Sequence, residues 1–536
     1  MLWVLAHHSI KDDTMNPARR LALQALRLPL ALAVIAGLAS CVFRSAEVTT
    51  IDPQHAPQEV KSPVKAHLVD GSTVLYPSGV RISGNTLMTP GRRYALGTAT
   101  VTESGRIPLD SVVGLESYDT RVNTGKSVAA TSAGIVLGVP AAAILAVAIF
   151  GSCPTFYTDS AGTPVLEAEG FSYSIAPLFE QRDVDRLRGL PTADGKFVLH
   201  VRNEALETHY INSLELVEVR HASDELVVPD QAGRAIAMKG LSAPWTVRDR
   251  AGRDISSSVR ADDGVVFSTA EETVQNVSAA DLNDYIDIAV PATSGADSVA
   301  IVLDMRNSLL NTVLLYDQIL GAPGTRSIDW LAGDLSHIGN AIDMGRWYST
   351  RMGMRISVRE GATYRQVARS GDSGPIAFHH VAVLVPVPQQ SHDDSVHVRL
   401  TFAADDWRID MLRVAAKWRR PEMRRVPAAR VDMYDPAQNA DALRSVHDAD
   451  EGYLITTPGQ AFTVSFDVGN ITTGARTFML ASQGYYTEWV RGSWIKQASG
   501  KPFAPSDAAL AEAIKSWHAK QPQMERQFYS TRISAR

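Results

Sequence analysis

Short runs of β-branched or alternating apolar residues recur along most of the chain. Turn residues such as Pro291 and Gly469-Asn470 separate several of these runs. Repeated short strands with this punctuation are typical of β-sandwiches, so the pattern predicts a mainly β fold with two or more sandwich-like domains. The clearest predicted strands are residues 197–201, 214–219, 285–290, 299–303, 381–387, 396–402 and 462–468.

The same pattern predicts a small N-terminal β-domain over residues 67–123, because turn signals at Asp70-Gly71 and Ser83-Gly84-Asn85 separate strand-like runs there. Three segments are better suited to helices. In the last of them, Ser506 is a candidate N-cap, and an apolar stripe follows at spacings of four and three residues. The predicted helices are 308–320, 330–347 and 507–517, and the stripe is Leu510, Ile514 and Trp517.

Two segments are too apolar for a half-buried strand. The first is 28–38, which follows a basic stretch with Arg19, Arg20 and Arg27. A basic start and a short apolar core describe a secretory signal rather than a membrane span, with Met15 as the expected start of translation.

This signal ends in Leu38-Ala39-Ser40-Cys41, which resembles the lipobox of bacterial lipoproteins. The resemblance implies a signal peptide over 1–40, cleavage before Cys41 and attachment of lipid to its thiol. Val42 occupies the position where Asp would favour inner-membrane retention, so the resemblance implies an outer-membrane location facing the periplasm or the exterior. Residues 41–66 are then a tether rich in proline. The alternative is an ordinary inner-membrane anchor in which Cys41 has no role.

The second apolar segment, Ser127 to Phe150, contains no charged residue and is long enough to span a bilayer as a helix. Arg121 and Lys126 precede it, which would place its N-terminal side in the cytoplasm. Lipid on Cys41 would place that same side outside the inner membrane. The chain therefore cannot both carry lipid at Cys41 and span the inner membrane with this segment. We expect the segment to pack beside acyl chains or against another envelope protein; the alternative is a helical hairpin bent at Pro140 and buried between domains.

The remainder is expected to form a β-rich region over 151–425, a second β-rich domain over 426–500 and a C-terminal helix and tail over 501–536. Parts of 151–500 resemble a β-rich module of large secreted bacterial repeat proteins. The resemblance implies architecture and no catalytic role. Its residues are Ser152-Cys153-Pro154, Phe171, Ile175, the stretch from Arg202-Asn203-Glu204 to Val219, and Tyr485 to Trp489.

Composition narrows the function further. The net charge of −6 offers no broad basic surface, which argues against nucleic-acid binding. Only two cysteines are present, and with Cys41 lipidated only Cys153 remains. An internal disulfide and a metal site of paired cysteines are therefore excluded, and Cys153 is expected to be buried.

Two motifs suggest catalysis or nucleotide binding and fail on inspection. Gly371 to Pro375 resembles the nucleophile loop of chymotrypsin-like serine proteases, with Ser373 as nucleophile, but the glycine expected before the proline is missing. His337 lacks the flanking residues of that family, and a polar turn explains the loop as well. Thr124 to Ser127 resembles the end of a phosphate-binding loop, but Thr120 replaces its first glycine.

Histidines and aromatic residues offer two weaker candidates. His379 and His380 are adjacent, and neighbours on a strand point to opposite faces, so one metal ion rarely binds both. A ligand platform for sugar rings is the other candidate, and core packing is its alternative. The platform would consist of Tyr485, Tyr486, Trp489 and Trp494.

The sequence therefore favours an envelope-anchored structural or protein-interaction module. Its expected partners are membrane lipid at Cys41 and other envelope proteins at Ser127 to Phe150. We expect no catalytic residue, cofactor site or metal site. Glycan or peptidoglycan binding through Tyr485 to Trp494 is the alternative, and a serine hydrolase using Ser373 is the remoter one.

Overall fold

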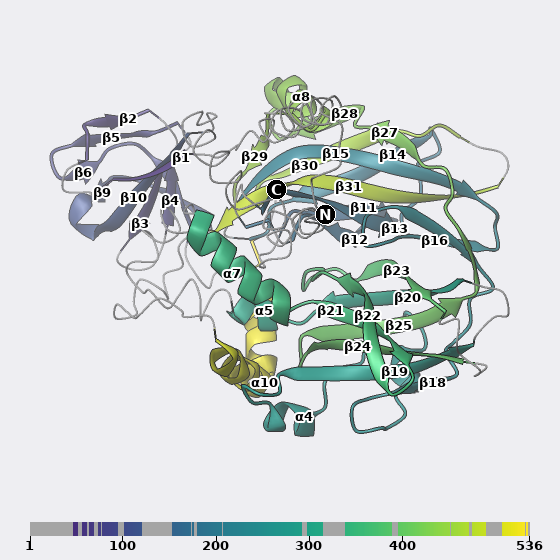
Figure 1. The fold of residues 1–536 in the computed structure, drawn as a ribbon. Coiled ribbons are helices and arrows are strands. Elements are labelled where there is room, and N and C mark those ends of the chain that lie inside the picture. The colour runs from purple at the N-terminus through teal and green to yellow at the C-terminus, as the bar shows by residue number, and fades with distance from the viewer. Residues whose placement is uncertain are drawn as a thin grey trace, which may run out of the picture.

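A computed structural model shows a mainly β protein of several separate sheets with few helices, which confirms the predicted fold class (Figure 1). All seven of the clearest predicted strands are present. The structure describes residues 47–51, 56–61, 64–68, 73–76, 78–94, 101–119, 153–172, 174–175, 179–205, 207–291, 297–314, 338–387, 395–450, 452–470, 474–488, 506–530 and 532–533.

The N-terminal β-domain has its own hydrophobic core and lies to one side of the larger body (Figure 1). It begins before the predicted residue 67, because strands within the expected tether of 41–66 pair into its sheets. One sheet has the order β1 (Glu47–Ile51), β10 (Val112–Asp119), β3 (Val64–Leu68), β4 (Thr73–Tyr76), β7 (Gly91–Tyr94) and β8 (Val101–Ser104). The second has the order β2 (Glu59–Val60), β5 (Val80–Ser83), β6 (Thr86–Leu87) and β9 (Ile107–Pro108), and η3 (Leu109–Ser111) follows β9. Alternate residues of β5 are buried, as expected for a sheet with one solvated face.

The first large sandwich consists of two facing sheets. Its outer sheet has the order β12 (Thr163–Glu169), β11 (Thr155–Ser160), β14 (Lys196–Arg202), β30 (Ala461–Asp467) and β28 (Arg430–Met433). Its inner sheet has the order β13 (Gln181–Leu187), β31 (Ala475–Glu488), β15 (Glu207–His221) and β27 (Arg424–Pro427), with β29 (Leu454–Thr456) also paired to β15. Leu199 of the outer sheet and Leu216 of the inner sheet are among the residues of the shared core.

The expected division of the chain between residues 425 and 426 is wrong. Strands β30 and β31 lie in the segment predicted to be a second domain, yet β30 pairs with β14 and β31 pairs along the length of β15. Both halves of the chain therefore build the same sandwich. Its pairing spans more than two hundred residues, and local patterns of hydrophobicity do not specify partners at that separation.

The second large sandwich is inserted between these halves. Its inner sheet has the order β23 (His379–Pro386), β20 (Ser298–Asn307) and β25 (Trp407–Ala415). Its outer sheet has the order β18 (Thr246–Arg248), β19 (Asn283–Pro291), β24 (Ser395–Ala403), β21 (Met354–Glu360) and β22 (Thr363–Ser370). Valine, isoleucine and leucine dominate the core between the two sheets.

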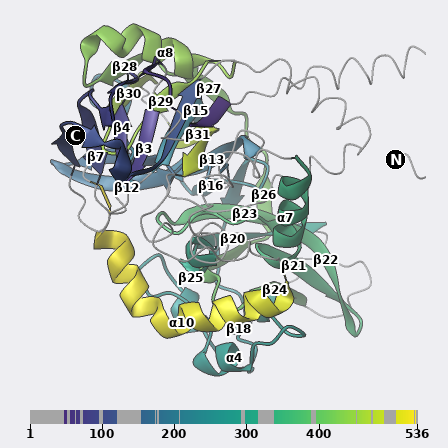
Figure 2. The same cartoon turned by 90° about the vertical axis from the view of Figure 1, so that its left-hand side faces the viewer.

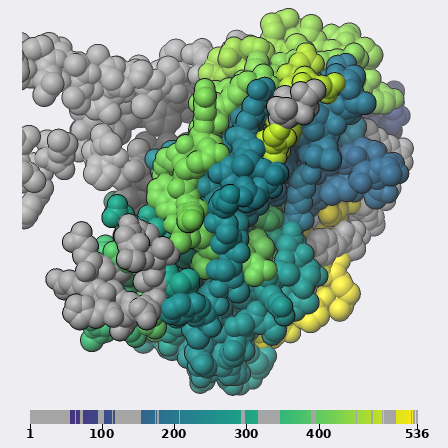
Figure 3. Space-filling model, turned by 90° about the vertical axis from the view of Figure 1, so that its right-hand side faces the viewer, coloured from purple at the N-terminus to yellow at the C-terminus, as the bar shows by residue number. Residues whose placement is uncertain are grey.

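A small middle sheet, β16 (Glu225–Pro229), β17 (Ala235–Lys239) and β26 (Lys417–Arg419), joins the two sandwiches. Ala235 and Ala237 of β17 pack against the inner sheet of the first sandwich, while Ile236 and Met238 pack against the inner sheet of the second. Successive side chains of a strand point to opposite faces, so β17 is apolar on both. The result is a stack of five sheets. In Figure 3, teal atoms from the middle of the chain lie against green atoms from nearer its C-terminal end, as the pairing of β17 with β26 requires.

The helices lie outside this stack. Among the described residues, α5 lies within the predicted helix 308–320, and α7 covers the described part of the predicted helix 330–347 and continues to Arg351. The helices are α4 (Glu271–Asn276), α5 (Leu310–Val313), α7 (Ile338–Arg351), α8 (Asn439–His447) and α10 (Asp507–Ser530), with short turns η5 (Ser256–Val259) and η9 (Pro436–Gln438).

Helix α10 confirms the prediction for 507–517 and extends beyond it. Ser506 Oγ accepts a hydrogen bond from the Ala509 N–H, as an N-cap does, and Leu510, Ile514 and Trp517 are fully buried. These three side chains belong to a hydrophobic cluster that includes Val274 of α4 and Leu310 of α5 and continues into the core of the first sandwich. The helix runs along the molecule near α4 (Figure 2).

His518 fastens α10 to the second sandwich. Its Nδ1 lies 3.0 Å from an Asp405 oxygen in the turn before β25, and its Nε2 lies 2.6 Å from Glu271 of α4. These two carboxylates raise the pKa of His518 to about 9, against a smaller opposing effect of burial.

The proposed signal, Cys41 and Ser127 to Phe150 lie outside the described residues. In the part of the chain that the structure describes, no helix combines the length and apolar character needed to cross a bilayer.

The middle sheet makes a direct prediction about stability. Ile236→Ala should lower the free energy of unfolding by about 2–4 kcal/mol, because it removes buried apolar volume between two sheets. Thr246→Ala, at an exposed strand position, should change it by less than about 0.5 kcal/mol. Chemical denaturation followed by circular dichroism measures both. Equal effects of the two substitutions would contradict the assigned role of the middle sheet.

His518 makes a prediction about pH. Its pKa is higher in the folded protein than the ordinary value of 6.5, so its contribution to stability is complete below about pH 6.5 and is lost as the pH rises through about 9. The wild-type free energy of unfolding should therefore fall over this interval more than that of His518→Gln. Denaturant titrations at pH 6 and pH 9.5 make the comparison. The same pH dependence in both proteins would show that His518 does not couple the two elements.

Candidate functional site

Gly371 to Pro375, the segment that resembles a protease nucleophile loop, forms a loop whose hydrogen bonds link several elements. The Asp372 carboxylate is fully buried and accepts hydrogen bonds from Asn307 Nδ2 at 3.0 Å and from the Tyr348 hydroxyl at 2.9 Å. The Gly353 N–H also donates to it, at 3.2 Å. The loop therefore connects the end of β20, helix α7 and the start of β21.

Asn307 is the centre of this network. Its amide nitrogen also donates to Asp406 at 3.0 Å, and its amide oxygen accepts the Ser373 N–H at 2.7 Å. Asn311 donates to the same Asp406 oxygen at 2.8 Å. Burial is the main cause that raises the pKa of Asp372, to about 6, and that of Asp406. Two buried carboxyl groups that share one amide donor favour retention of a proton between them.

The loop also fastens the second sandwich to the first. Glu169, at the end of β12, accepts hydrogen bonds from the backbone N–H groups of Ile376 at 2.8 Å and Ala377 at 3.0 Å. A Cβ atom at Gly374 would lie only 2.6 Å from the Glu169 carboxylate, and φ at Gly374 is +90°. Glycine is required at this position by both the close approach and the backbone conformation.

Ser373 has little in common with a catalytic serine. Its Oγ is buried and has no hydrogen-bond partner among the described residues, and its backbone N–H is already used by Asn307. A nucleophilic serine needs a base within hydrogen-bond reach and free N–H groups for the oxyanion. His337, the residue considered for that base, lies outside the described residues. The geometry of the loop therefore supports a structural role, in which the loop connects the two sandwiches.

His379 and His380, at the start of β23, enter two separate clusters of buried acidic residues. His379 Nδ1 forms an ion pair with Asp185, and Asp183 and Glu169 lie nearby. Burial lowers the pKa of His379, but the three carboxylates outweigh it and raise the pKa to about 10. Burial raises the pKa values of Glu169 and Asp183 to about 7 each. This cluster buries one histidine among three acidic residues where the two sandwiches meet.

His380 points instead toward Asp304, its partner in the register between β23 and β20. His380 Nδ1 lies 3.3 Å from Asp304 Oδ1. Arg188 Nη2 lies 3.1 Å from Asp262 and 3.5 Å from Asp304. Burial is the main cause that lowers the pKa of His380 to about 3 and raises that of Asp304 to about 7. Asp262, Asp304 and His380, called the Asp-Asp-His cluster below, each offer a ligand atom, and these atoms lie within 4.8 Å of one another.

The expected aromatic platform is not exposed at the two positions that the structure describes. Tyr485 and Tyr486 are buried, with 1% and 0% of their surface exposed. The Tyr485 ring stacks on Tyr210, with centroids 4.5 Å apart and planes 9° apart, and Tyr453 packs edge-on against both. Core packing between β15 and β31 explains these rings, while Trp489 and Trp494 lie outside the described residues.

Of the remaining candidates, one lies among the described residues and two lie outside them. Cys153 is buried, as expected, and burial is the main cause that raises the pKa of its thiol. Cys41 and the segment Thr124 to Ser127 lie outside the described residues.

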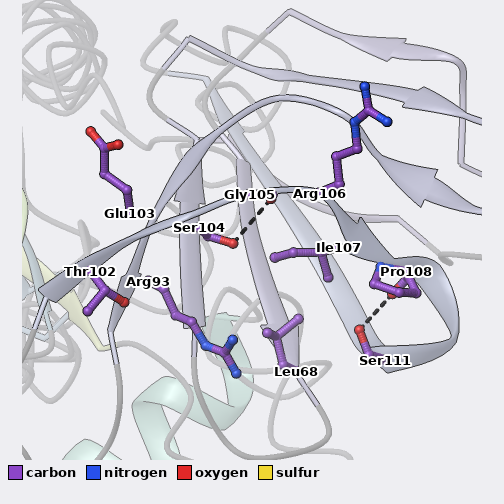
Figure 4. Close-up of a pocket in the computed structure, with 10 residues that line it drawn as sticks. All are labelled: Leu68, Arg93, Thr102, Glu103, Ser104, Gly105, Arg106, Ile107, Pro108 and Ser111. Carbon is purple, nitrogen blue, oxygen red and sulfur yellow. Dashed lines mark hydrogen bonds between the residues drawn. The ribbon is translucent and has the colours of Figure 1, made fainter.

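A pocket of about 390 Å³ lies in the N-terminal domain (Figure 4). Leu68, Arg93 and Ile107 contribute to its lining. The charged ends of Glu103 and Arg106 point away from each other in Figure 4, so they do not converge on a common ligand.

Sequence reasoning missed both acidic clusters. Their members come from β12, β13, β20, β23 and the loop after η5, and no spacing along the chain links one of these elements to another. The available signal was an acidic residue inside an apolar strand, such as Asp304 between Leu303 and Met305. A charge at such a position is costly to bury unless it has a partner.

No known family model matches the chain, and no curated protein matches it in sequence. Solved structures give only weak similarity. A structure of allantoicase is 12% identical with a TM-score of 0.16, and the match covers 50% of this chain and 92% of that one. A structure of infectious bursal disease virus Gt strain is 8% identical with a TM-score of 0.11, covering 65% and 89% of the two chains. A structure of tripeptidyl peptidase 2 is also 8% identical, with a TM-score of 0.12, covering 91% and 30%.

The Asn307 network predicts two contrasting substitutions. Asn307→Ala should lower the free energy of unfolding by about 2–4 kcal/mol, because two buried carboxyl groups lose a shared donor. Ser373→Ala should change it by less than about 1 kcal/mol, since its Oγ makes no hydrogen bond within the described residues. Thermal and denaturant unfolding measure both effects. A large loss of unfolding free energy in Ser373→Ala, with a negligible loss in Asn307→Ala, would contradict the roles assigned to these residues.

Proposed function

We propose that this chain is an envelope lipoprotein, anchored through Cys41, whose body of stacked β-sheets is a non-enzymatic structural or protein-interaction module. The observation that carries the proposal is Leu38-Ala39-Ser40-Cys41 at the end of a basic and apolar leader. Small residues before the cysteine and a short apolar core fit cleavage of a secretory signal. Lipid on the Cys41 thiol then holds the protein at the membrane surface, where more than one acyl chain is needed for stable anchoring.

The geometry of the described residues supports a binding or structural role over a hydrolase. The loop around Ser373 is occupied with internal hydrogen bonds, and its neighbours are held by buried carboxylates. Two sandwiches joined through β17, a strand that is apolar on both faces, are suited to presenting surfaces to a partner. Large apolar side chains that remain exposed can serve as contact points, and they include Leu190, Trp245 and Tyr434.

The glycan-binding alternative has less support. Its platform depended on four aromatic residues, and two of them, Tyr485 and Tyr486, are packed inside the first sandwich.

Lipid attachment can be tested by metabolic labelling with an alkyne fatty acid in cells that express the full chain. The wild type and Cys153→Ala should both be labelled, because Cys153 is buried in the folded body. Cys41→Ala should lose the label and leave the membrane fraction. Mass spectrometry should find the mature protein beginning at an acylated Cys41. An unlabelled wild type that retains its leader would contradict the proposal.

The interaction role needs a separate experiment. Crosslinking in intact membranes, followed by purification, should recover other envelope proteins with the wild type and fewer with a variant that lacks residues 127–150. Recovery of every partner by that variant would remove the segment from the interaction surface. Recovery of none by either protein would contradict the interaction role itself.

A further inference from the structure

We propose that the Asp-Asp-His cluster is a binding site for one divalent transition-metal cation of the Zn²⁺ or Mn²⁺ class. It lies at the end of the inner sheet of the second sandwich, where β20 and β23 are neighbours (Figure 1). This inference is independent of lipid attachment at Cys41. It differs from the expectation of no metal site, which considered His379 and His380 together as ligands of one ion; here His380 alone would contribute a ligand.

The backbone places all three ligands firmly. Asp304 and His380 are cross-strand partners on β20 and β23, so regular sheet pairing fixes their separation. Asp262 lies in the loop after η5, and Asp410 of β25 holds that loop through hydrogen bonds from the N–H groups of Asp263 at 3.2 Å and Gly264 at 3.0 Å. A site with ligands on paired strands and a fastened loop has the preorganisation that metal binding requires.

Asp304 supplies the observation that points to a ligand. Its side chain has no exposed surface, and neither carboxylate oxygen accepts a hydrogen bond from any described residue. Buried carboxylates are nearly always hydrogen-bonded or bound to a cation. Its nearest ionisable neighbours of possible positive charge are His380 at 3.3 Å and Arg188 at 3.5 Å, both without hydrogen-bond geometry.

The separation of 3.3 Å between His380 Nδ1 and Asp304 Oδ1 is typical of two ligands on one ion. Bonds to zinc are about 2.0–2.2 Å long for both nitrogen and oxygen, so ligand atoms at neighbouring coordination positions lie about 3–3.5 Å apart. One imidazole nitrogen with two carboxylates suits zinc or manganese better than calcium or magnesium, which prefer oxygen ligands alone. Three protein ligands leave further positions for water.

Arg188 is the natural competitor for this site. Its guanidinium contacts both aspartates, and a cation would take over that role as counter-charge. The Arg188 side chain is 47% exposed and that of Asp262 is 40% exposed, so the arginine has room to rotate into solvent and the site has a route of entry. The backbone N–H of Arg188 is held separately by Glu167, so such a rotation leaves the chain in place.

If Arg188 competes with the cation, removal of its charge should strengthen metal binding. An ion pair with a purely structural role would not produce this effect. The purified full chain is treated with a chelator and titrated with Zn²⁺ and, separately, with Mn²⁺ by calorimetry. The wild type should bind one equivalent of at least one of them. Asp304→Asn and His380→Gln should weaken binding at least tenfold, whereas Arg188→Gln should strengthen it several-fold because the competing charge is gone.

Two further variants complete the design. His447→Gln, at an exposed histidine beside Asp448, is the matched control and should bind as the wild type does. Asp262→Asn carries the test if either buried variant fails to fold, since its side chain is partly exposed. Absence of binding by the wild type would overturn the proposal. So would binding that is unchanged in Asp262→Asn, Asp304→Asn and His380→Gln, or that weakens in Arg188→Gln.

Discussion

The fold depends on β17, a short strand of the middle sheet whose apolar side chains are buried on both faces. In β17, Ala235 and Ala237 face one sandwich while Ile236 and Met238 face the other. An ordinary sandwich strand alternates apolar and polar side chains because one of its faces meets solvent. Here that alternation is replaced by a division between small and large apolar residues. The small side chains allow close approach of the first sandwich, and the larger ones fill the space toward the second.

Charged groups complete the junction beside this apolar layer. Glu169, the pair of Asp185 with His379, and Arg186, which donates to the Val227 carbonyl, all link the first sandwich to elements beyond it. Buried charges are weak sources of net stability, but they penalise any arrangement that leaves one of them unpaired. The apolar middle sheet therefore supplies the attraction between sandwiches, and the polar groups select one relative orientation.

Sequence patterns predicted the local structure well, because strands and amphipathic helices follow from the spacing of apolar residues. The strand at 197–201 and the helix stripe of Leu510, Ile514 and Trp517 are examples. The partner of that strand, β30, lies more than 250 residues away, and nothing local identifies it. The candidate site had the same difficulty. Long-range pairing alone brings together Asp262, Asp304 and His380. The loop around Ser373 resembles a protease motif in sequence, but its hydrogen bonds give it a structural role.

The two sandwiches behave as one body because they share the middle sheet. Hydrogen exchange measured by mass spectrometry in increasing denaturant tests it most directly. If the claim holds, the slowest amides of β14, β17 and β20 will converge on one opening free energy, since none of these strands can open alone. The contrary result is a distinctly lower opening free energy for the slow amides of β20 than for those of β14, with the amides of β17 matching only one of these strands. That result would show that the sandwiches are independent.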